Sequence, residues 1–187
     1  MQTVLGLTGL AGCGKSTVAN YLKSKYGFEF LVFSDVLKEE AKRRGLLTGK
    51  ESLEESKRIL SMLGENLRKE TGNNAILAVK VIERIKSMGL EKVVVDGFRS
   101  PAEVELFRKE FPSFKLFNVF APAEVRFKRR QLEDHTLTRA DFESRDKEDI
   151  EKKGLDVVIK MADFTLNNSS DYRSLFLQID HLMRNVL

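Results

Sequence analysis

The chain has 187 residues, of which 42% are apolar and 32% are charged, and its formal net charge at pH 7 is +4. This length and balance are typical of one globular domain with a sizeable core. The single cysteine, Cys13, excludes an intramolecular disulfide, and no apolar run reaches the ~18 residues of a membrane span. We therefore expect a cytoplasmic protein without a signal peptide or a membrane segment.

The first apolar run, residues 3–9 (TVLGLTG), predicts a strand, and a helical pattern begins near Lys15. Between them, Gly9–Ser16 match the pattern G-x-x-x-x-G-K-S in full. In such a loop, glycines let backbone N–H groups converge on phosphate oxygens, and the helix start adds its positive dipole end. The lysine neutralises the β- and γ-phosphates and is the first catalytic candidate, while the serine hydroxyl ligates Mg²⁺. The sequence therefore predicts ATP and Mg²⁺ as cofactors, bound by Gly9, Ala11, Gly12, Cys13, Gly14, Lys15, Ser16 and Thr17.

Cys13 occupies a variable position of this loop. Lys15 and the helix start are groups that lower a thiol pKa, which would suit a redox switch. We favour the alternative of a tolerated small residue.

The second apolar run, residues 28–35 (FEFLVFSD), predicts a strand that ends at Asp35. Three roles are open for this carboxylate. It would accept a proton from a hydroxyl acceptor, or hydrogen-bond an acceptor sugar, or only cap the helix that follows. The charged stretch after that helix, residues 42–52, is a candidate loop or lid over a site.

Two helices are expected next. Ser52 and Glu55 form a capping box, and the helix that follows carries Leu53, Leu60, Leu63 and Leu67. Asn74 is expected to start the second helix, which Gly89 ends. The residues expected to face inward in that helix are Ala78, Val81 or Ile82, Ile85 and Met88.

The third apolar run, residues 92–97 (KVVVDG), predicts a buried strand that ends at Asp96. Its carboxylate is expected beside the glycine loop, where it would hold a Mg²⁺-bound water near Ser16. The other reading is a helix cap, which we disfavour because Ser100, with Pro101 and Glu103, already supplies the next helix start. The guanidinium of Arg99 suits a phosphate or carboxylate of a substrate, although a solvated loop arginine is the alternative.

After the fourth run, residues 115–121 (KLFNVFA), a basic cluster reads RFKRR at 126–130, and the densely charged segment 126–153 is expected to form a helical lid. Phosphoryl transfer concentrates charge on the transferring oxygens, so cations over the phosphates stabilise the transition state. Arg126 and Arg130 share a helix face and are the preferred catalytic candidates, with Arg145 as the third. The alternative is that acidic neighbours pair with these arginines on a solvated helix.

The fifth run, residues 162–168 (ADFTLNN), ends in two asparagines, and a last helix is expected after Ser170 and Asp171. Asn167 is a candidate contact for the base of the donor nucleotide. A turn-forming Asn-Asn pair is the other reading.

Five strands separated by helices predict an α/β fold, a three-layer α/β/α arrangement with a five-stranded parallel sheet and a helical lid insert. No repeat or flexible linker divides the chain. We therefore expect a single domain over residues 1–187, with an acceptor-binding region at about 35–75 and the lid at about 126–153.

The stretch Asp96-Gly97-Phe98-Arg99 resembles the D-G-F-P-R stretch of adenylate kinases, whose arginine contacts the acceptor nucleotide; here the proline is missing and the arginine stands one place earlier. Those kinases also carry an aspartate after the second strand, followed three residues on by a phosphate-binding arginine. In Ser34-Asp35-Val36-Leu37-Lys38, Lys38 stands where that arginine would be. The resemblance implies substrate binding by Ser34, Asp35, Lys38 and Arg99.

The start LTG…GKSTVANYL and the end ADFTLNNSS look more like dephospho-CoA kinases. Over nearly the whole length, the chain is similar to archaeal adenylate-kinase-related proteins of unsettled substrate. The shared runs include SDV with EEAKRRG, VVVDG with RS and AEVE, and RD before an acidic residue. The resemblance implies a nucleotide kinase fold and leaves the acceptor open.

The acceptor chemistry separates two readings. A nucleoside monophosphate arrives already anionic, with a second pKa near ~6, so it needs only cations. Lys38, Arg68 and Arg99 would supply them, which favours a nucleoside monophosphate kinase. A hydroxyl acceptor, as in dephospho-CoA kinase, would use Asp35 as its base.

Classes other than a kinase fit less well. A GTP-dependent regulator would need an N-K-x-D motif, which the chain lacks. A nucleic-acid-associated NTPase is permitted by RFKRR, but the chain has no tryptophan and no evident stacking platform. We therefore expect an ATP-dependent phosphotransferase with a small-molecule nucleotide substrate, acting as a monomer or homodimer, with no membrane partner and no nucleic-acid partner.

Overall fold

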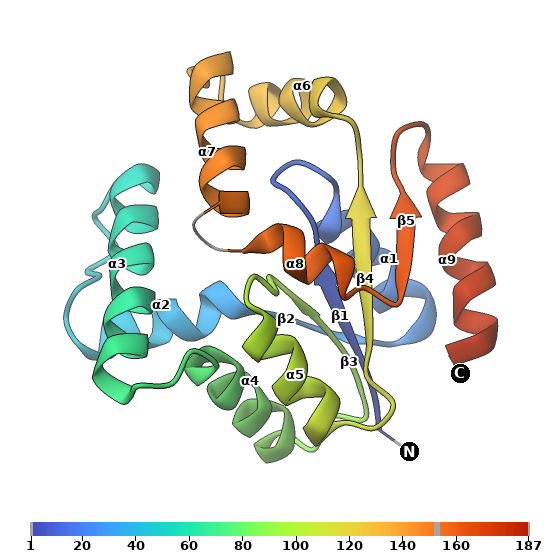
Figure 1. Ribbon diagram of the computed structural model, residues 1–187, viewed down its shortest axis with the longest axis horizontal. Coiled ribbons are helices and arrows are strands. Elements are labelled where there is room, and N and C mark those ends of the chain that lie inside the picture. The colour runs from blue at the N-terminus through green and yellow to red at the C-terminus, as the bar shows by residue number, and fades with distance from the viewer. Residues whose placement is uncertain (1, 152–153, 187) are drawn as a thin grey trace.

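The computed structural model describes residues 2–151 and 154–186, with the side chains of Leu53, Glu54 and Lys57 left out. Five parallel strands form one sheet in the order β2-β3-β1-β4-β5 (Figure 1). The strands are β1 (Thr3–Thr8), β2 (Glu29–Val32), β3 (Lys92–Asp96), β4 (Lys115–Phe120) and β5 (Phe164–Asn167). The predicted five-stranded parallel sheet is confirmed.

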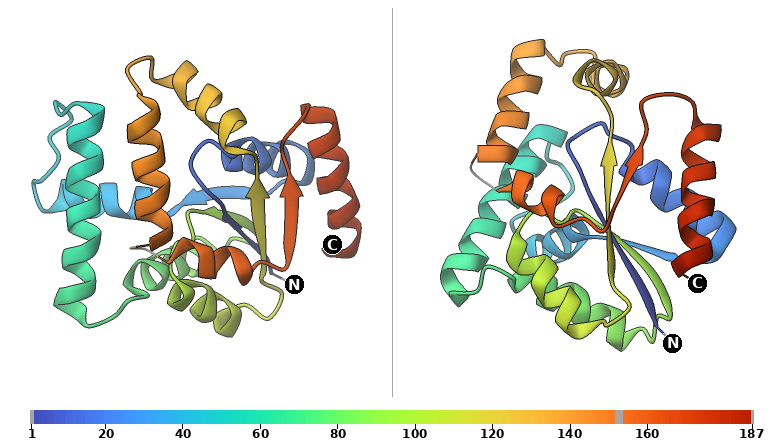
Figure 2. Two further views of the ribbon diagram at one scale, coloured as in Figure 1. Left: turned by 45° about the horizontal axis from the view of Figure 1, so that its top comes forward. Right: turned by 45° about the vertical axis from the view of Figure 1, so that its right-hand side comes forward.

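Helices cover both faces of the sheet, as Figure 2 shows. One face is packed by α1 (Lys15–Tyr26) and α9 (Tyr172–Val186), and the other by α4 (Ile76–Ser87), α5 (Pro101–Glu110) and α8 (Leu155–Lys160). α2 (Phe33–Arg43) and α3 (Leu53–Thr71) lie beside β2 and α4. α6 (Ala123–Glu133) and α7 (Arg139–Glu151) lie over the carboxyl ends of the strands (Figure 1).

The sheet separates two apolar cores because successive side chains of a strand point to opposite faces. In β1, Val4 belongs to the core under α4 and α5, whereas Leu5 and Leu7 belong to the core under α1 and α9. Strands buried on both faces read as continuous apolar runs, which is why the runs were recognisable.

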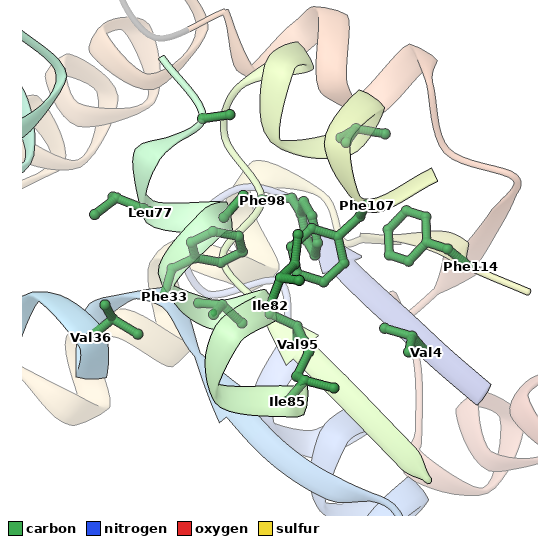
Figure 3. Close-up of a cluster of buried hydrophobic side chains, with 14 of the residues drawn as sticks. Val4, Phe33, Val36, Leu77, Ile82, Ile85, Val95, Phe98, Phe107 and Phe114 are labelled. Atoms are coloured by element: carbon green, nitrogen blue, oxygen red, sulfur yellow. The ribbon is translucent and has the colours of Figure 1, made fainter. Parts of the chain in front are cut away.

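An aromatic cluster fills the core between the sheet and α5 (Figure 3). Phe98 packs edge-on against Phe107, with ring centroids 4.9 Å apart, and Phe114 lies beside both. A Cβ atom at Gly6 of β1 would lie 2.8 Å from Phe98 and Phe114, so only glycine lets the rings reach the strand. This packing holds the loop after β3 against the sheet.

The helix caps largely follow the sequence signals. Ser52 and Ser100 both form complete capping boxes, and Gly89, at φ 62°, follows the C-cap of α4. Asn74 does not start α4: the N-cap is Ala75, whose N–H donates to Asn73 Oδ1.

Most side chains predicted to face inward are buried, including Ala78, both Val81 and Ile82, and Ile85. Met88 is 54% exposed because it is the C-cap of α4 and lies beyond the last turn. The side chain of Leu53 lies outside the described part of the chain.

The second apolar run divides into two elements. β2 ends at Val32, which is the N-cap of α2, so Phe33, Ser34 and Asp35 form the first turn of that helix. Phe33 turns inward against Phe98, with centroids 5.0 Å apart. The reading of Asp35 as a helix cap is therefore wrong, since Asp35 stands three residues after the N-cap.

The predicted lid comprises α6 from Arg126 onward and α7. Its last two residues, 152–153, lie outside the described residues. The other lid candidate, 42–52, is the end of α2 followed by an exposed connection to α3.

Candidate active site

The loop between β1 and α1 requires its glycines. Gly9, Gly12 and Gly14 have φ of 134°, 79° and 99°, a region that other residues rarely adopt. A Cβ atom would lie 2.4 Å from Val119 O at Gly9 and 2.2 Å from Asn168 Nδ2 at Gly14. The loop therefore combines a special backbone conformation with close contacts from two neighbouring segments.

A cavity of about 430 Å³ opens beside this loop. It is lined by Gly12, Gly14, Lys15, Ser16, Thr17, Asp96, Arg129, Arg130, Leu132, Glu133, Asn168 and Tyr172. The fold thus brings the glycine loop, the end of β3 and the lid helix α6 to one place. Another cavity, of about 590 Å³, lies between α2 and α4 away from the loop and is lined by charges of both signs.

Lys15 folds back over the loop that precedes it. Its Nζ donates to Gly9 O at 2.9 Å and lies 3.8 Å from Cys13 Sγ. An ammonium held over the carbonyls of the loop is available to move onto phosphate oxygens that enter the cavity.

Asp96 is the acidic residue of the cavity that comes from the end of a strand; Glu133 of α6 is the other acidic lining residue. Within the part of the chain that the structure describes, the Oδ1 atom of Asp96 is buried and has no hydrogen-bond partner. Burial raises the pKa of this carboxyl, while the charges of Lys15 and Arg99 oppose the rise. A buried carboxylate oxygen without a partner calls for a cation.

The residues present fit Mg²⁺ rather than a metal held by the protein alone. Mg²⁺ typically takes one or two protein ligands and completes its shell with phosphate oxygens and water. The Ser16 hydroxyl and Asp96 provide such a partial set. The described residues contain no group of three or more His, Cys, Asp or Glu side chains able to hold an ion by themselves.

Cys13 is buried in the loop, at 1% exposure. Burial raises the pKa of its thiol, and this outweighs the opposing charge of Lys15. Lys15 does lower the pKa, as expected, but burial has the larger effect and the net direction is upward. A packed, unreactive thiol agrees with the reading of a tolerated small residue.

Arg126 fastens the lid to the glycine loop. It is 4% exposed, and its guanidinium donates to both carboxylate oxygens of Asp146, at 3.0 and 2.6 Å. It also donates to Ala11 O and Ala121 O, each at 3.1 Å. In this arrangement the guanidinium is engaged within the protein, and its catalytic role stays a prediction.

Arg130 and Arg145 lie in different surroundings. Arg130 lines the cavity, and its Nη1 pairs with Glu133 Oε2 at 2.5 Å. This ion pair agrees with the alternative that acidic neighbours pair with these arginines. Arg145 is half-buried on α7 and forms no ion pair within residues 2–151 and 154–186. It is not among the residues that line the cavity. Both remain candidates for contact with phosphates.

Arg129 is a cavity residue that the sequence reasoning missed. Its Nη2 donates to Asn168 O at 3.0 Å, whereas its Nη1 is buried and unpartnered within the described chain. Helical spacing selected Arg126 and Arg130 as a pair, but the face of α6 that borders the cavity carries Arg129. The RFKRR cluster itself was the signal.

Asn168 is the second missed residue. It is buried, its Nδ2 donates to Cys13 O at 2.8 Å, and its backbone N–H donates to Phe120 O. Asn167, which we had selected, is exposed and forms a turn in which its Oδ1 accepts from Ser169 N. The turn-forming alternative describes Asn167 as found, and its contact with a donor base stays a prediction.

The acceptor-side residues are arranged around α2, α3 and the loop before α5. Asp35 and Lys38 form an exposed ion pair at 2.9 Å on α2, and Ser34 lies half-buried beside them. Arg99 Nη1 lies 3.6 Å from Asp149 Oδ1 of α7. One predicted acceptor residue, Arg99, therefore lies close to the lid.

Glu103 links two of the predicted acceptor arginines. It is buried, its Oε2 accepts from the N–H groups of Arg99 and Ser100 at 3.0 and 3.1 Å, and its Oε1 lies 3.6 Å from Arg68 Nη2. Burial raises the pKa of its carboxyl, while the Arg99 amide and the Arg68 charge oppose the rise. The capping box was visible in the sequence, but the link to Arg68 was not.

Comparison with known proteins places the chain in a family. The AAA domain model matches residues 8–151. A UPF0200 protein of Methanothermobacter thermautotrophicus is 33% identical over 188 residues, which cover 99% of this chain and 91% of that protein. The chain belongs to the UPF0200 family.

Solved structures with a similar fold include a kinase. TT1252 from Thermus thermophilus matches with a TM-score of 0.68 and 19% identity, over 100% of this chain and 98% of that one. Shikimate kinase from Bacteroides thetaiotaomicron matches with a TM-score of 0.57 and 14% identity, over 98% of both chains. At these identities the likeness shows the fold alone: this UPF0200 protein has a P-loop kinase-like α/β fold. Across the described residues, no helix combines the length and apolarity needed to cross a membrane.

Proposed function

We propose that this UPF0200 protein is a phosphotransferase that moves the γ-phosphoryl group of Mg-ATP to a nucleoside monophosphate. One observation carries the proposal: one cavity brings together Lys15, Ser16 and a buried oxygen of Asp96 that has no partner among the described residues. These groups are a cation for phosphate, a metal-binding hydroxyl and a carboxylate in need of a cation.

The residues of the chain have distinct roles in this proposal. The N–H groups of the glycine loop hold the donor phosphates, and Lys15 leaves Gly9 O to neutralise them. Ser16 and Asp96 would hold Mg²⁺, which offsets the negative charge of the phosphates. Arg130 exchanges its ion pair with Glu133 for a phosphate oxygen once the cavity is filled.

The acceptor side supports an anionic acceptor. Glu103 accepts from the main-chain N–H of Arg99 and lies 3.6 Å from the guanidinium of Arg68, so both arginines are positioned around one buried carboxylate. Arg99 also approaches Asp149 of the lid. An incoming phosphate that binds Arg99 would compete for the guanidinium with a lid carboxylate, which links acceptor binding to the position of α7.

A hydroxyl acceptor is the second candidate, with dephospho-CoA as one example. Asp35 favours it, because its carboxylate lies in the first turn of α2 near the acceptor side and would accept a proton. The likeness in fold to shikimate kinase is compatible with such an acceptor. Asp35 pairs with Lys38 at 2.9 Å, an exposed contact that a substrate could replace in either role.

A coupled assay for ADP formation tests the proposal. Purified protein is supplied with Mg-ATP and, separately, with each nucleoside monophosphate, with dephospho-CoA, with shikimate or with no acceptor. ADP formed with a monophosphate, together with the matching diphosphate, supports the first candidate. ADP formed only with dephospho-CoA or shikimate supports the second, and ADP that is equal with and without acceptors would show an ATPase instead.

A further inference from the structure

Two large apolar side chains border the outer part of the phosphate cavity. Tyr172, the first residue of α9, is 57% exposed, and Leu132, in the last turn of α6, is 76% exposed. Side chains of this size are usually exposed singly, but these two line the same cavity. In Figure 1, α6 lies above the loop between β1 and α1, and α9 lies to its right, beyond β5.

The ring of Tyr172 is held by a stack of aromatic rings. It lies 6.1 Å from the ring of Phe176 at an interplanar angle of 15°, and Phe176 in turn stacks on Tyr21, at 4.0 Å and 3°. Such support fixes the orientation of the exposed ring before any ligand binds, which lowers the entropic cost of binding. At the end of the stack that borders the cavity, the exposed ring of Tyr172 is available to stack on one more planar group.

The cavity also contains a polar side-chain atom that is available to bind a ligand. Arg129 Nη1 is buried and, within the described chain, unpartnered, while the same side chain is anchored to Asn168 O. The cavity is therefore prepared for a ligand that is anionic near Arg129 and Lys15 and planar near Tyr172. A nucleoside triphosphate has this division.

The two asparagines at the end of β5 already make several hydrogen bonds within the protein. Asn168 uses its N–H, its carbonyl and its side-chain amide on Phe120 O, Arg129 and Cys13 O, respectively. Asn167 exchanges two hydrogen bonds with Gln178 through its N–H and carbonyl. The side-chain amide of Asn168 and the main-chain groups of Asn167 are therefore committed to contacts within the protein.

A site formed by Leu132 and Tyr172 therefore differs from one that recognises a base through hydrogen bonds to its edge. We propose that the purine base of the donor lies between Tyr172 and Leu132 and is held by stacking, so that the protein uses ATP and GTP almost equally. Stacking is tolerant of base identity because every base has a π face, and strong discrimination requires polar groups that pair with one base only. This inference rests on the proposed function, since it concerns the donor of the same reaction.

The test is equilibrium binding of three probes in the presence of Mg²⁺: ATP, GTP and inorganic tripolyphosphate, which has no base. For the wild type we expect ATP and GTP to bind within about threefold of each other and tighter than tripolyphosphate. Tyr172→Ala should weaken ATP and GTP by a similar factor, about tenfold or more, and leave tripolyphosphate unchanged. Tyr172→Phe should bind like the wild type, because the ring and not the hydroxyl makes the contact. Leu177→Ala is the matched control, an exposed residue of α9 that does not line the cavity.

Each contrary result has a distinct meaning. ATP preferred over GTP by more than tenfold, or affinity lost in Tyr172→Phe, would show readout of the base edge or a hydroxyl contact and overturn the inference. A Tyr172→Ala variant that binds ATP normally, or that loses tripolyphosphate equally, would also overturn it while the proposed function stands. A wild type that binds none of the probes would overturn the proposed function and the inference together.

Discussion

Single residues of the glycine loop are constrained by their neighbours as much as by the ligand the loop is expected to hold. Gly14 allows the amide of Asn168 to lie against the loop, and Gly9 allows the carbonyl of Val119 to do so. Val119 lies in β4 and Asn168 follows β5, so two segments from the same flank of β1 brace the loop. The shape of the phosphate site is therefore set before any phosphate arrives.

Lys15→Ala should abolish acceptor-dependent ADP formation and leave the fold intact. The Lys15 side chain contacts Gly9 O and lies near Cys13, so its removal costs one hydrogen bond of the loop, about 1 kcal/mol. Thermal unfolding followed by circular dichroism should shift by only a few degrees. Lys23→Ala, which removes an exposed charge on the same helix, is the control and should keep full activity. Substantial turnover by Lys15→Ala would contradict the role given to this residue.

Glu103 should make stability depend on pH. Because burial raises the pKa of Glu103, the folded protein binds a proton at this site more readily than the unfolded chain does. The contribution of Glu103 to the free energy of unfolding therefore falls as pH rises from the ordinary pKa of a glutamate, about 4.3, through the raised pKa of the folded state. Above the raised pKa this contribution is constant.

Glu103→Gln tests this sign. Glutamine retains an oxygen to accept from the N–H groups of Arg99 and Ser100, but it does not titrate. Relative to the wild type, the variant should become more stable as pH rises from about 4.5 to 7.5. Urea denaturation at several pH values measures the difference. A difference that is constant over this range, or that decreases with pH, would refute the assignment.

At the scale of elements, α6 and α7 form one unit through aromatic and ionic contacts. Phe142 of α7 lies 5.4 Å from Phe127 of α6, and the guanidiniums of Arg126 and Arg139 lie 4.9 and 6.0 Å from its ring. Arg126 continues to the glycine loop through Ala11 O. The base of the lid is therefore fixed to the phosphate site, and movement that admits substrates would have to occur further along the lid.

Arg126→Met should destabilise the protein far more than Arg139→Met. Arg126 is a buried partner of Asp146, and removing one member of a buried pair costs about 3–5 kcal/mol. At about 2–4 °C per kcal/mol for a domain of this size, the midpoint of thermal unfolding should fall by roughly 6–20 °C. Arg139 pairs with exposed carboxylates of Glu124 and Glu143, which is worth less than about 1 kcal/mol. Equal effects of the two substitutions would contradict the fastening role of Arg126.

At the scale of the whole molecule, the parallel sheet gathers loops from distant parts of the sequence at one edge. β1 and β3 pair in parallel, with Leu7 opposite Asp96, so the glycine loop and the end of β3 lie side by side. β4 leads into α6 on the other flank of the loop. In an open parallel sheet the ligand site lies beyond the carboxyl ends of the strands, and the cavity is found there.

Mg-ATP should stabilise the whole protein and slow hydrogen exchange around the cavity. At a ligand concentration 100 times the Kd, binding adds about 2.7 kcal/mol, which corresponds to an increase of roughly 5–10 °C in the unfolding midpoint. Amide exchange should slow most in residues 9–17 and 129–133 and little in the solvent-facing turns of α4. EDTA should remove most of the effect, because Ser16 and Asp96 are assigned to Mg²⁺. A midpoint that is unchanged by Mg-ATP would count against the site.

The sequence alone was sufficient for the features that depend on neighbours along the chain. Apolar runs marked the five strands, most clearly the central strands β1, β3 and β4, which are largely buried on both faces. Ser52 and Ser100 marked two helix starts, because a cap acts within one turn. Gly9–Ser16 marked the phosphate loop, because its chemistry lies in eight consecutive residues. The α/β fold and the glycine loop could therefore be read in advance.

Only the tertiary structure decided which side chains come together beyond the carboxyl ends of the strands. That Arg129 borders the cavity while Arg126 is buried depends on how α6 is rotated against the loop, and helical spacing alone does not set this rotation. Likewise, Asn168 rather than Asn167 reaches Cys13, because the chain turns at the end of β5. Contacts between residues more than a hundred positions apart follow from packing, since no local sequence signal records which faces of two elements come together.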